Sequence, residues 1–231
     1  MKTKLIILGL AICFLGCVGQ AQNIEQKVKV GAFFAGLCPL DSSFAQYSGS
    51  EFIGLFVENG KFHLRPTIVD LVELYHDGHQ AVYQYLLSRD ENSLFLFSYF
   101  IGYNPNPIEA VNGGRGIAIM PGDTFNFTYN GISYTFQADG EMDWRSNISN
   151  YTLSFSKTGC QTKQILVSHA FTEDGYAIIL FIGDLDGDGK PDIILNGTHH
   201  YEFSNIMLFL SSTAEDGNLL RLEGGEACWV N

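Results

Sequence analysis

Residues 124–136 read Thr-Phe-Asn-Phe-Thr-Tyr-Asn-Gly-Ile-Ser-Tyr-Thr-Phe and predict a β-hairpin. Apolar or aromatic side chains alternate with polar ones on both sides of Asn130-Gly131, the pattern of a strand with one buried face. Asn-Gly between two such runs is the strongest short hairpin signal, because a type I′ turn requires positive φ at both central residues. This stretch therefore indicates antiparallel β-structure.

The rest of the chain has the same character. With 25 glycines, six prolines and 13% aromatic residues, it favours many short strands joined by glycine turns. Further strand candidates are 27–34, 52–57, 61–65, 94–103, 116–120, 151–156, 164–170, 176–182, 192–195, 206–210 and 219–222. Their spacing predicts a mainly β fold, an antiparallel sandwich or barrel-like sheet. No repeat of fixed period occurs, which argues against a complete propeller built from this chain alone.

Two segments fit this scheme less simply. Residues 68–75 place acids at 70 and 73, which suits one short helix, whereas the β-branched start of the segment suits a strand, and the two alternatives stay open. Residues 104–116 are rich in proline, asparagine and glycine, and they predict a linker or a mobile surface loop. No composition shift flanks them, so residues 22–231 are expected to form a single compact domain.

The first residues have the layout of a secretory signal. Two lysines precede an apolar run at 5–15, and small residues follow it up to Ala21. We expect residues 1–21 to be a signal peptide and the mature chain to be exported, with a periplasmic, cell-surface or extracellular location. Cys17 lies in a stretch that resembles a bacterial lipoprotein box, so lipid anchoring through Cys17 is the alternative.

Charge and cysteine content exclude several functions. Residues 1–21 contain two lysines and no acid, which leaves 11 basic and 25 acidic residues in the mature chain, a formal charge of −14. Nucleic acid is a poor partner for such a surface. No later stretch of 18 apolar residues predicts a transmembrane segment. Cys38, Cys160 and Cys228 remain after cleavage and allow at most one intramolecular disulfide, whose pairing the sequence leaves open.

One motif in the sequence predicts a metal-binding site. Residues 184–192 read Asp-Leu-Asp-Gly-Asp-Gly-Lys-Pro-Asp, with acids at positions one, three, five and nine. Four carboxylates this close together repel one another unless a cation lies among them. Calcium takes six to eight oxygen ligands on a flexible loop, whereas magnesium demands a strict octahedron and zinc prefers nitrogen or sulfur. We therefore expect a calcium ion, with ligands from Asp184, Asp186, Asp188, the Lys190 carbonyl and Asp192.

The loop resembles those of a known family. Residues 177–182 and 192–195, on either side of it, read as strands, and Leu195 stands where an EF-hand needs a glutamate. Ile182-Gly-Asp-Leu-Asp-Gly-Asp-Gly-Lys-Pro-Asp-Ile-Ile194 is similar to the strand-loop-strand calcium loops of FG-GAP and VCBS-type repeats, over residues 176–197 only. The resemblance implies an ion that staples a hairpin and performs no chemistry.

Other residue groups are weaker. His169, His199, His200 and Glu202 could supply a second metal site, but their spacing gives it little support. Glu51, Glu141 and Asp143 are arbitrary candidates for a secreted hydrolase acting on polysaccharide or peptide. The sequence favours a non-enzymatic binding or structural protein with a protein or glycan partner at the surface, and this hydrolase, with calcium as scaffold, is the alternative.

Overall fold

The computed structural model describes residues 29–31, 33–34, 38–39, 42–74, 83–90 and 93–229. The predicted signal peptide, including Cys17, lies outside these residues. Within them, the paired strands are antiparallel and one short 3-10 helix is present, η1 (Ser42–Tyr47). The mainly β, antiparallel fold predicted from the sequence is confirmed. No helix in the described part of the chain is long and apolar enough to cross a membrane.

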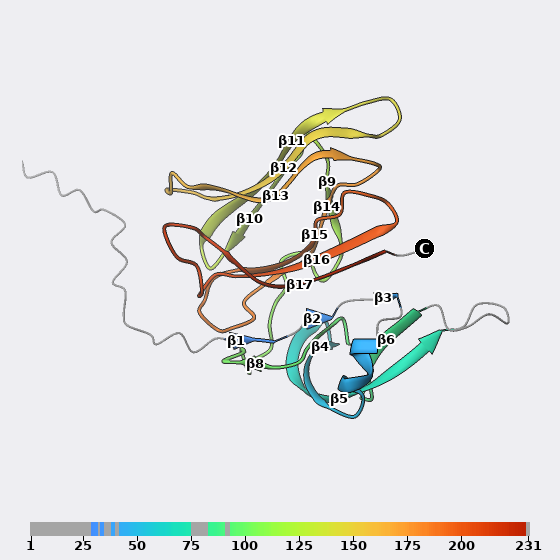
Figure 1. Ribbon diagram of the computed structural model, residues 1–231. Helices are drawn as coiled ribbons and strands as arrows, with labels where there is room; N and C mark the ends of the chain where they lie inside the picture. Colours follow the sequence, from blue (N-terminus) through green and yellow to red (C-terminus); the bar gives the residue numbers. More distant parts are fainter. Residues whose placement is uncertain are drawn as a thin grey trace, which may run out of the picture.

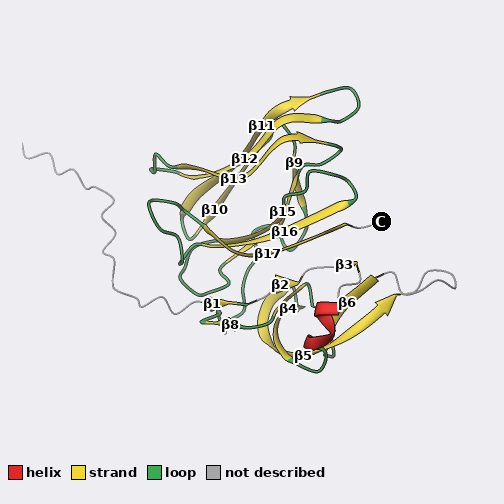
Figure 2. Cartoon of the chain, in the orientation of Figure 1, coloured by secondary structure: helices red, strands yellow, loops and turns green. Residues whose placement is uncertain are grey.

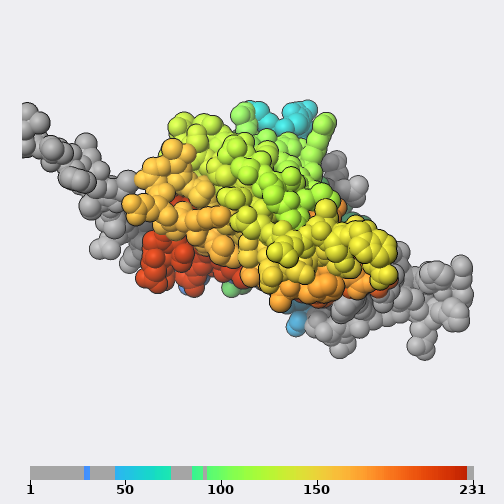
Figure 3. Space-filling view, turned by 90° about the horizontal axis from the view of Figure 1, so that it is seen from above, coloured from blue at the N-terminus to red at the C-terminus, as the bar shows by residue number. Residues whose placement is uncertain are grey.

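Three sheets form three layers (Figure 1). The outer sheet contains β10 (Thr124–Tyr129), β11 (Ile132–Met142), β12 (Ile148–Lys157) and β13 (Lys163–Thr172), in that order. The central sheet has the order β17-β16-β15-β14-β9, with β9 (Ile117–Ile119), β14 (Ala177–Gly183), β15 (Asp192–Asn196), β16 (Phe203–Leu210) and β17 (Arg221–Trp229). Seen from above, the outer sheet and its loops cover much of the molecule (Figure 3).

The third layer, the N-terminal sheet, has six strands in the order β2-β7-β4-β5-β6-β3. They are β2 (Phe33–Phe34), β3 (Cys38–Pro39), β4 (Glu51–Glu58), β5 (Lys61–Leu74), β6 (Tyr83–Ser88) and β7 (Phe95–Phe97). A separate pair joins β1 (Lys29–Val30) to β8 (Phe100–Ile101). Figure 2 shows how completely strands dominate the chain.

The central sheet is buried on both faces. In β15, Ile193 and Leu195 pack into the core shared with the outer sheet, and Ile194 packs into the core shared with the N-terminal sheet. A strand covered on both faces gains from apolar residues at every position, so its sequence runs Ile-Ile-Leu without alternation. The central sheet therefore lies between two hydrophobic cores, and each of its faces lines one of them.

The predicted hairpin forms as expected. Asn130 and Gly131 adopt φ values of 45° and 76°, and Tyr129 is paired with Ile132 across the turn. Alternation places Phe127, Tyr134 and Phe136 on the inner face, where their rings stack on one another at centroid separations of 5.3 and 5.9 Å. The turn type and the buried face thus both follow from the local sequence.

Residues 68–74 form a strand. They are the second half of β5, whose first half pairs with β4 and whose second half pairs with β6. Val69 is fully buried and faces Ser88 across the sheet. Because β5 pairs first with β4 and then with β6, its backbone hydrogen-bonding groups find partners along the whole strand. These pairings favour a strand over the alternative of a short helix.

Residues 104–116 contain no regular strand, but they are not a surface loop throughout. Ile108 is only 2% exposed, forms an isolated bridge with Phe62 and belongs to the core shared with the N-terminal sheet. Asn112 donates from Nδ2 to the Leu180 carbonyl at 3.0 Å. The predicted surface segment is therefore held to the core at Ile108, which its polar neighbours in the sequence do not indicate.

Of the three cysteines expected in the mature chain, Cys160 is exposed and makes no disulfide. The side chains of Cys38 and Cys228 lie outside the described part of the structure.

Candidate metal centre

The acidic motif forms the connection between β14 and β15, two neighbouring strands of the central sheet. Gly187 and Gly189 adopt φ values of 79° and 82°, which L side chains avoid, and so they allow the chain to curl. The Leu185 side chain is fully buried in the core and anchors the loop from below. The strand-loop-strand geometry expected from the sequence is therefore present.

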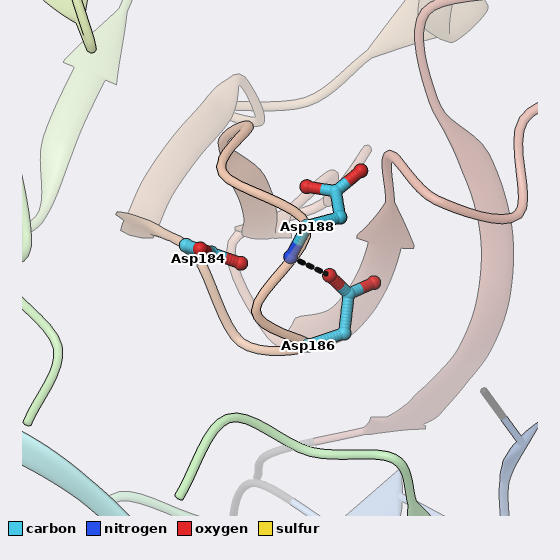
Figure 4. A group of neighbouring side chains, drawn as sticks. All are labelled: Asp184, Asp186 and Asp188. Atoms are coloured by element: carbon cyan, nitrogen blue, oxygen red, sulfur yellow. Dashed lines mark hydrogen bonds between the residues drawn. The ribbon is translucent and has the colours of Figure 1, made fainter. Parts of the chain in front are cut away.

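The carboxylates of Asp184, Asp186 and Asp188 converge within this loop (Figure 4). One oxygen from each lies within 4.8 Å of the other two, close enough to share one cation. Hydrogen bonds hold the curl: Gly187 N and Gly189 N donate to the two oxygens of Asp184 at 2.6 and 3.0 Å. Asp188 N donates to Asp186 Oδ1 at 3.2 Å, drawn as a dashed line in Figure 4.

The environment of these acids disfavours their charged forms. Burial raises the pKa of Asp184, and the nearby charge of Asp188 adds to the effect. Burial, reinforced by the charges of Asp188 and Asp184, raises the pKa of Asp186 from 3.8 to about 6. Anionic oxygens crowded in this way would be stabilised by a bound cation, so the three carboxylates could hold a metal ion.

Asp192 occupies a different place from the three other acids. It is fully buried, and its oxygens accept hydrogen bonds from Leu185 N at 2.7 Å and Ser211 N at 2.8 Å. Burial, followed by the charge of Asp186, raises its pKa well above the ordinary value. Asp192 thus ties the start of the loop to the end of β16. Direct binding of the ion through Asp192 stays a prediction.

Lys190 is bonded to the loop through its backbone and its side chain. Its backbone N donates to Asp188 Oδ1 at 2.8 Å, and its Nζ pairs with Asp188 Oδ2, also at 2.8 Å. Coordination through the Lys190 carbonyl stays a prediction too.

Sequence reasoning missed the residues that hold the loop from other elements. Ser211 Oγ lies 3.1 Å from both oxygens of Asp188, and Ser212 Oγ donates to Asp186 Oδ2 at 2.5 Å. Asn104 Nδ2 donates to the Asp184 carbonyl at 3.1 Å, and Asn130 Nδ2 donates to the Gly189 carbonyl at 2.7 Å. Only Asn130 carries a sequence signal, and that signal points to a turn. Tertiary structure alone brings these side chains to the loop.

The residues that could have supplied a second metal site come only partly together. The rings of His169 and His199 lie 5.6 Å apart, but His200 turns to Glu173, with Nε2 3.5 Å from Oε2. Glu202 donates from its backbone N to His200 Nδ1 at 3.0 Å. Within the described residues, Asp184, Asp186 and Asp188 are the group of three or more such side chains placed to hold a metal.

A scan against models of known protein families found no match, and searches of curated proteins and of solved structures found none either. No match supports membership in the FG-GAP or VCBS families, and the likeness rests on the acidic loop alone.

Proposed function

We propose that this chain is an exported, non-enzymatic binding or structural protein whose loop 184–192 holds a calcium ion. The observation that carries the proposal is the convergence of three carboxylates, from Asp184, Asp186 and Asp188, within 4.8 Å. A loop of this strand-loop-strand kind resembles those of FG-GAP and VCBS-type repeats, in which the ion is structural.

Calcium fits the donors better than other common metals. The loop offers carboxylate oxygens, with the hydroxyls of Ser211 and Ser212 beside them. Zinc favours nitrogen or sulfur, and magnesium keeps several waters in a strict octahedron. Asp192 and the Lys190 carbonyl complete the proposed ligand set, with water in any remaining position.

The ion would act as a staple between layers. Asn130 joins the loop to a hairpin of the outer sheet, while Asn104 joins it to the segment that leads from the N-terminal sheet. Ser211 and Ser212 join it to the connection after β16. A cation that fixes the loop therefore fixes its contacts with the outer sheet and with the segments that follow β8 and β16, as a structural site does.

The described positions of the candidate acids do not support the hydrolase alternative. Asp143 Oδ1 accepts hydrogen bonds from Arg145 N at 2.7 Å and Asn147 N at 3.0 Å, so it serves a turn. Hydrogen bonding, chiefly from the Asn147 side chain, lowers the pKa of Asp143, whereas a general acid needs a raised one. Glu51 belongs to the N-terminal sheet, two layers away from Glu141 in the outer sheet.

Export and surface partners complete the proposal. The signal-like residues 1–21 and the acidic mature chain support a periplasmic, cell-surface or extracellular protein that meets a protein or glycan. Extracellular calcium modules bind with dissociation constants of about 10⁻⁴–10⁻³ M, which suits a site filled outside the cell.

The first experiment is a calcium titration of residues 22–231 by calorimetry, with Asp186→Ala beside it. We expect one saturable site in the parent chain and none in the variant. At a hundredfold excess over the dissociation constant, calcium should stabilise the native state by about 2.7 kcal/mol, measured by thermal unfolding.

The matched control is Asp139→Ala, which removes an exposed acid of the outer sheet that pairs with Lys163. Its calcium binding should equal that of the parent chain. Identical melting curves with and without calcium in the parent chain would refute the calcium site.

A further inference from the structure

A small pocket of about 210 Å³ opens beside the acidic loop, between the outer sheet and the connection that follows β16. Tyr134, Phe155 and Lys157 line it from the outer sheet, Lys190 from the loop, and Leu219 from the opposite wall. Ligand sites for drug-sized molecules enclose about 300–1,000 Å³, so the occupant of this pocket must be smaller.

The charges in the pocket are opposite to those of the whole chain. Two lysines are among the described residues that line it, and no acid is, although the chain carries a formal charge of −12. The remaining lining is mainly aromatic or apolar, with two neutral polar residues. One of the two lysines, Lys190, pairs with Asp188, so the unpaired positive charge is that of Lys157, which suits a small anion that carries an apolar face.

Lys157 is placed unusually for a surface cation. It follows Phe155 by two residues in β12 and is the cross-strand partner of Tyr134, so it continues the row of side chains that faces the core. It is half-buried, and no ion pair or hydrogen bond to its ammonium group is found among the described residues. A core-facing, unpaired ammonium beside a pocket is a ready partner for a carboxylate.

Lys190 connects the pocket to the acidic loop. It lines the pocket, and its Nζ lies 2.8 Å from Asp188 Oδ2. A calcium ion bound by Asp188 would compete for that carboxylate and weaken its hold on the ammonium. The second lysine would then be available to an anion in the pocket.

We propose that this pocket binds a small organic carboxylate, held by Lys157 and Lys190, and that calcium in the loop strengthens the binding. The pocket stands independently of the calcium site, whereas the coupling rests on the proposed function. The apolar lining favours the C-terminal carboxylate of a peptide that ends in an apolar residue, and a uronic acid is the competing outcome of the test.

The test is calorimetry on residues 22–231 with two carboxylate probes, D-galacturonate and N-acetyl-leucine. Their neutral counterparts are methyl galactoside and N-acetyl-leucinamide. Each is titrated in saturating calcium, and again after calcium has been removed by a chelator and the chelator by desalting. We expect N-acetyl-leucine to bind and N-acetyl-leucinamide not to bind. Binding of D-galacturonate alone would overturn the peptide ligand.

Lys157→Met should weaken binding of N-acetyl-leucine by about tenfold or more, because it removes a charge-assisted hydrogen bond. The matched control is Lys61→Met, which changes an exposed lysine of the N-terminal sheet that pairs with Glu109, and it should bind like the parent chain. Removing calcium should weaken binding several-fold in the parent chain and have no effect in Asp186→Ala.

Different results would overturn the pocket, its coupling to calcium and the calcium site. The absence of saturable binding by both carboxylate probes overturns the pocket, as does equal binding by Lys157→Met and the parent chain. Carboxylate binding that ignores calcium, in a chain that does bind calcium, overturns the coupling alone. Carboxylate binding in a chain that binds no calcium overturns the calcium site and leaves the pocket standing.

Discussion

Three carboxylates in the acidic loop lie where the ionised form is disfavoured. Asp184, Asp186 and Asp192 are each desolvated, and each lies near another negative charge, so the pKa of each is raised. Protons and a cation are the two ways to relieve this repulsion. At the proposed calcium site, protonation and calcium binding would therefore compete for the same oxygens.

The raised pKa of Asp186 by itself makes stability depend on pH. The pKa of Asp186 is about 6 in the folded chain against 3.8 for the ordinary group, so the folded state binds the proton more tightly than the unfolded state. The resulting stabilisation is complete below about pH 4 and is lost as pH rises through 6. Without calcium, the free energy of unfolding, measured by urea denaturation, should therefore rise when pH falls from 7 to 5.

Calcium affinity should change in the opposite direction and fall over the same interval, as measured by calorimetry at each pH. Asp186→Asn keeps the shape of the side chain but cannot titrate, so it should flatten the pH dependence of stability that belongs to Asp186. A parent chain that loses stability on acidification from pH 7 to 5 without calcium would contradict this account.

Among the secondary-structure elements, the turn between β10 and β11 both connects two strands and contacts the acidic loop. Asn130 supplies the positive φ of 45° that the turn needs, and its side chain holds the Gly189 carbonyl at 2.7 Å. The two roles can be separated, since glycine accepts the same φ without a side chain. The turn is thus a support for the acidic loop as well as a connection between strands.

Asn130→Gly should keep the hairpin but lower calcium affinity several-fold, because the loop loses one of its anchors. The measurement is a calcium titration by calorimetry, with circular dichroism to verify the fold. Asn59→Gly is a matched control: Asn59 also begins an Asn-Gly turn, with φ 52°, between β4 and β5. Equal affinity in the two variants would show that the Asn130 side chain does not support the site.

On the scale of the whole molecule, the central sheet makes three layers interdependent. Ile193 and Ile194 are adjacent in β15 and both are fully buried, yet they face different cores. Loss of either core exposes one face of the same sheet. We therefore expect the outer and N-terminal sheets to unfold together.

Ile193→Val and Ile194→Val should each cost about 0.5–1.5 kcal/mol of stability. Native-state hydrogen exchange should show the same loss for amides of β12 and of β4 in both variants. Ile165→Val, at a side chain 52% exposed, should change stability by less than about 0.5 kcal/mol. Protection lost in one layer only would mean that the layers unfold independently.

The local features of this protein follow from short stretches of its sequence. Asn130-Gly131 specified its turn, because few residues tolerate positive φ. The spacing of Asp184, Asp186 and Asp188 along a tight loop brought together three carboxylates that could hold a metal ion. Both depend on a few neighbouring residues. Such features can be read without knowing the fold.

Features that depend on contacts between distant residues arise only in the folded chain. The strand at 68–74 was ambiguous until β4 and β6 paired with β5, and Ile108 looked like part of a loop until Phe62 covered it. Ser211 joins Asp188 across 23 residues, and Lys157 joins Lys190 in one pocket. No local pattern marks these contacts, because burial and proximity between distant segments arise only when the layers pack.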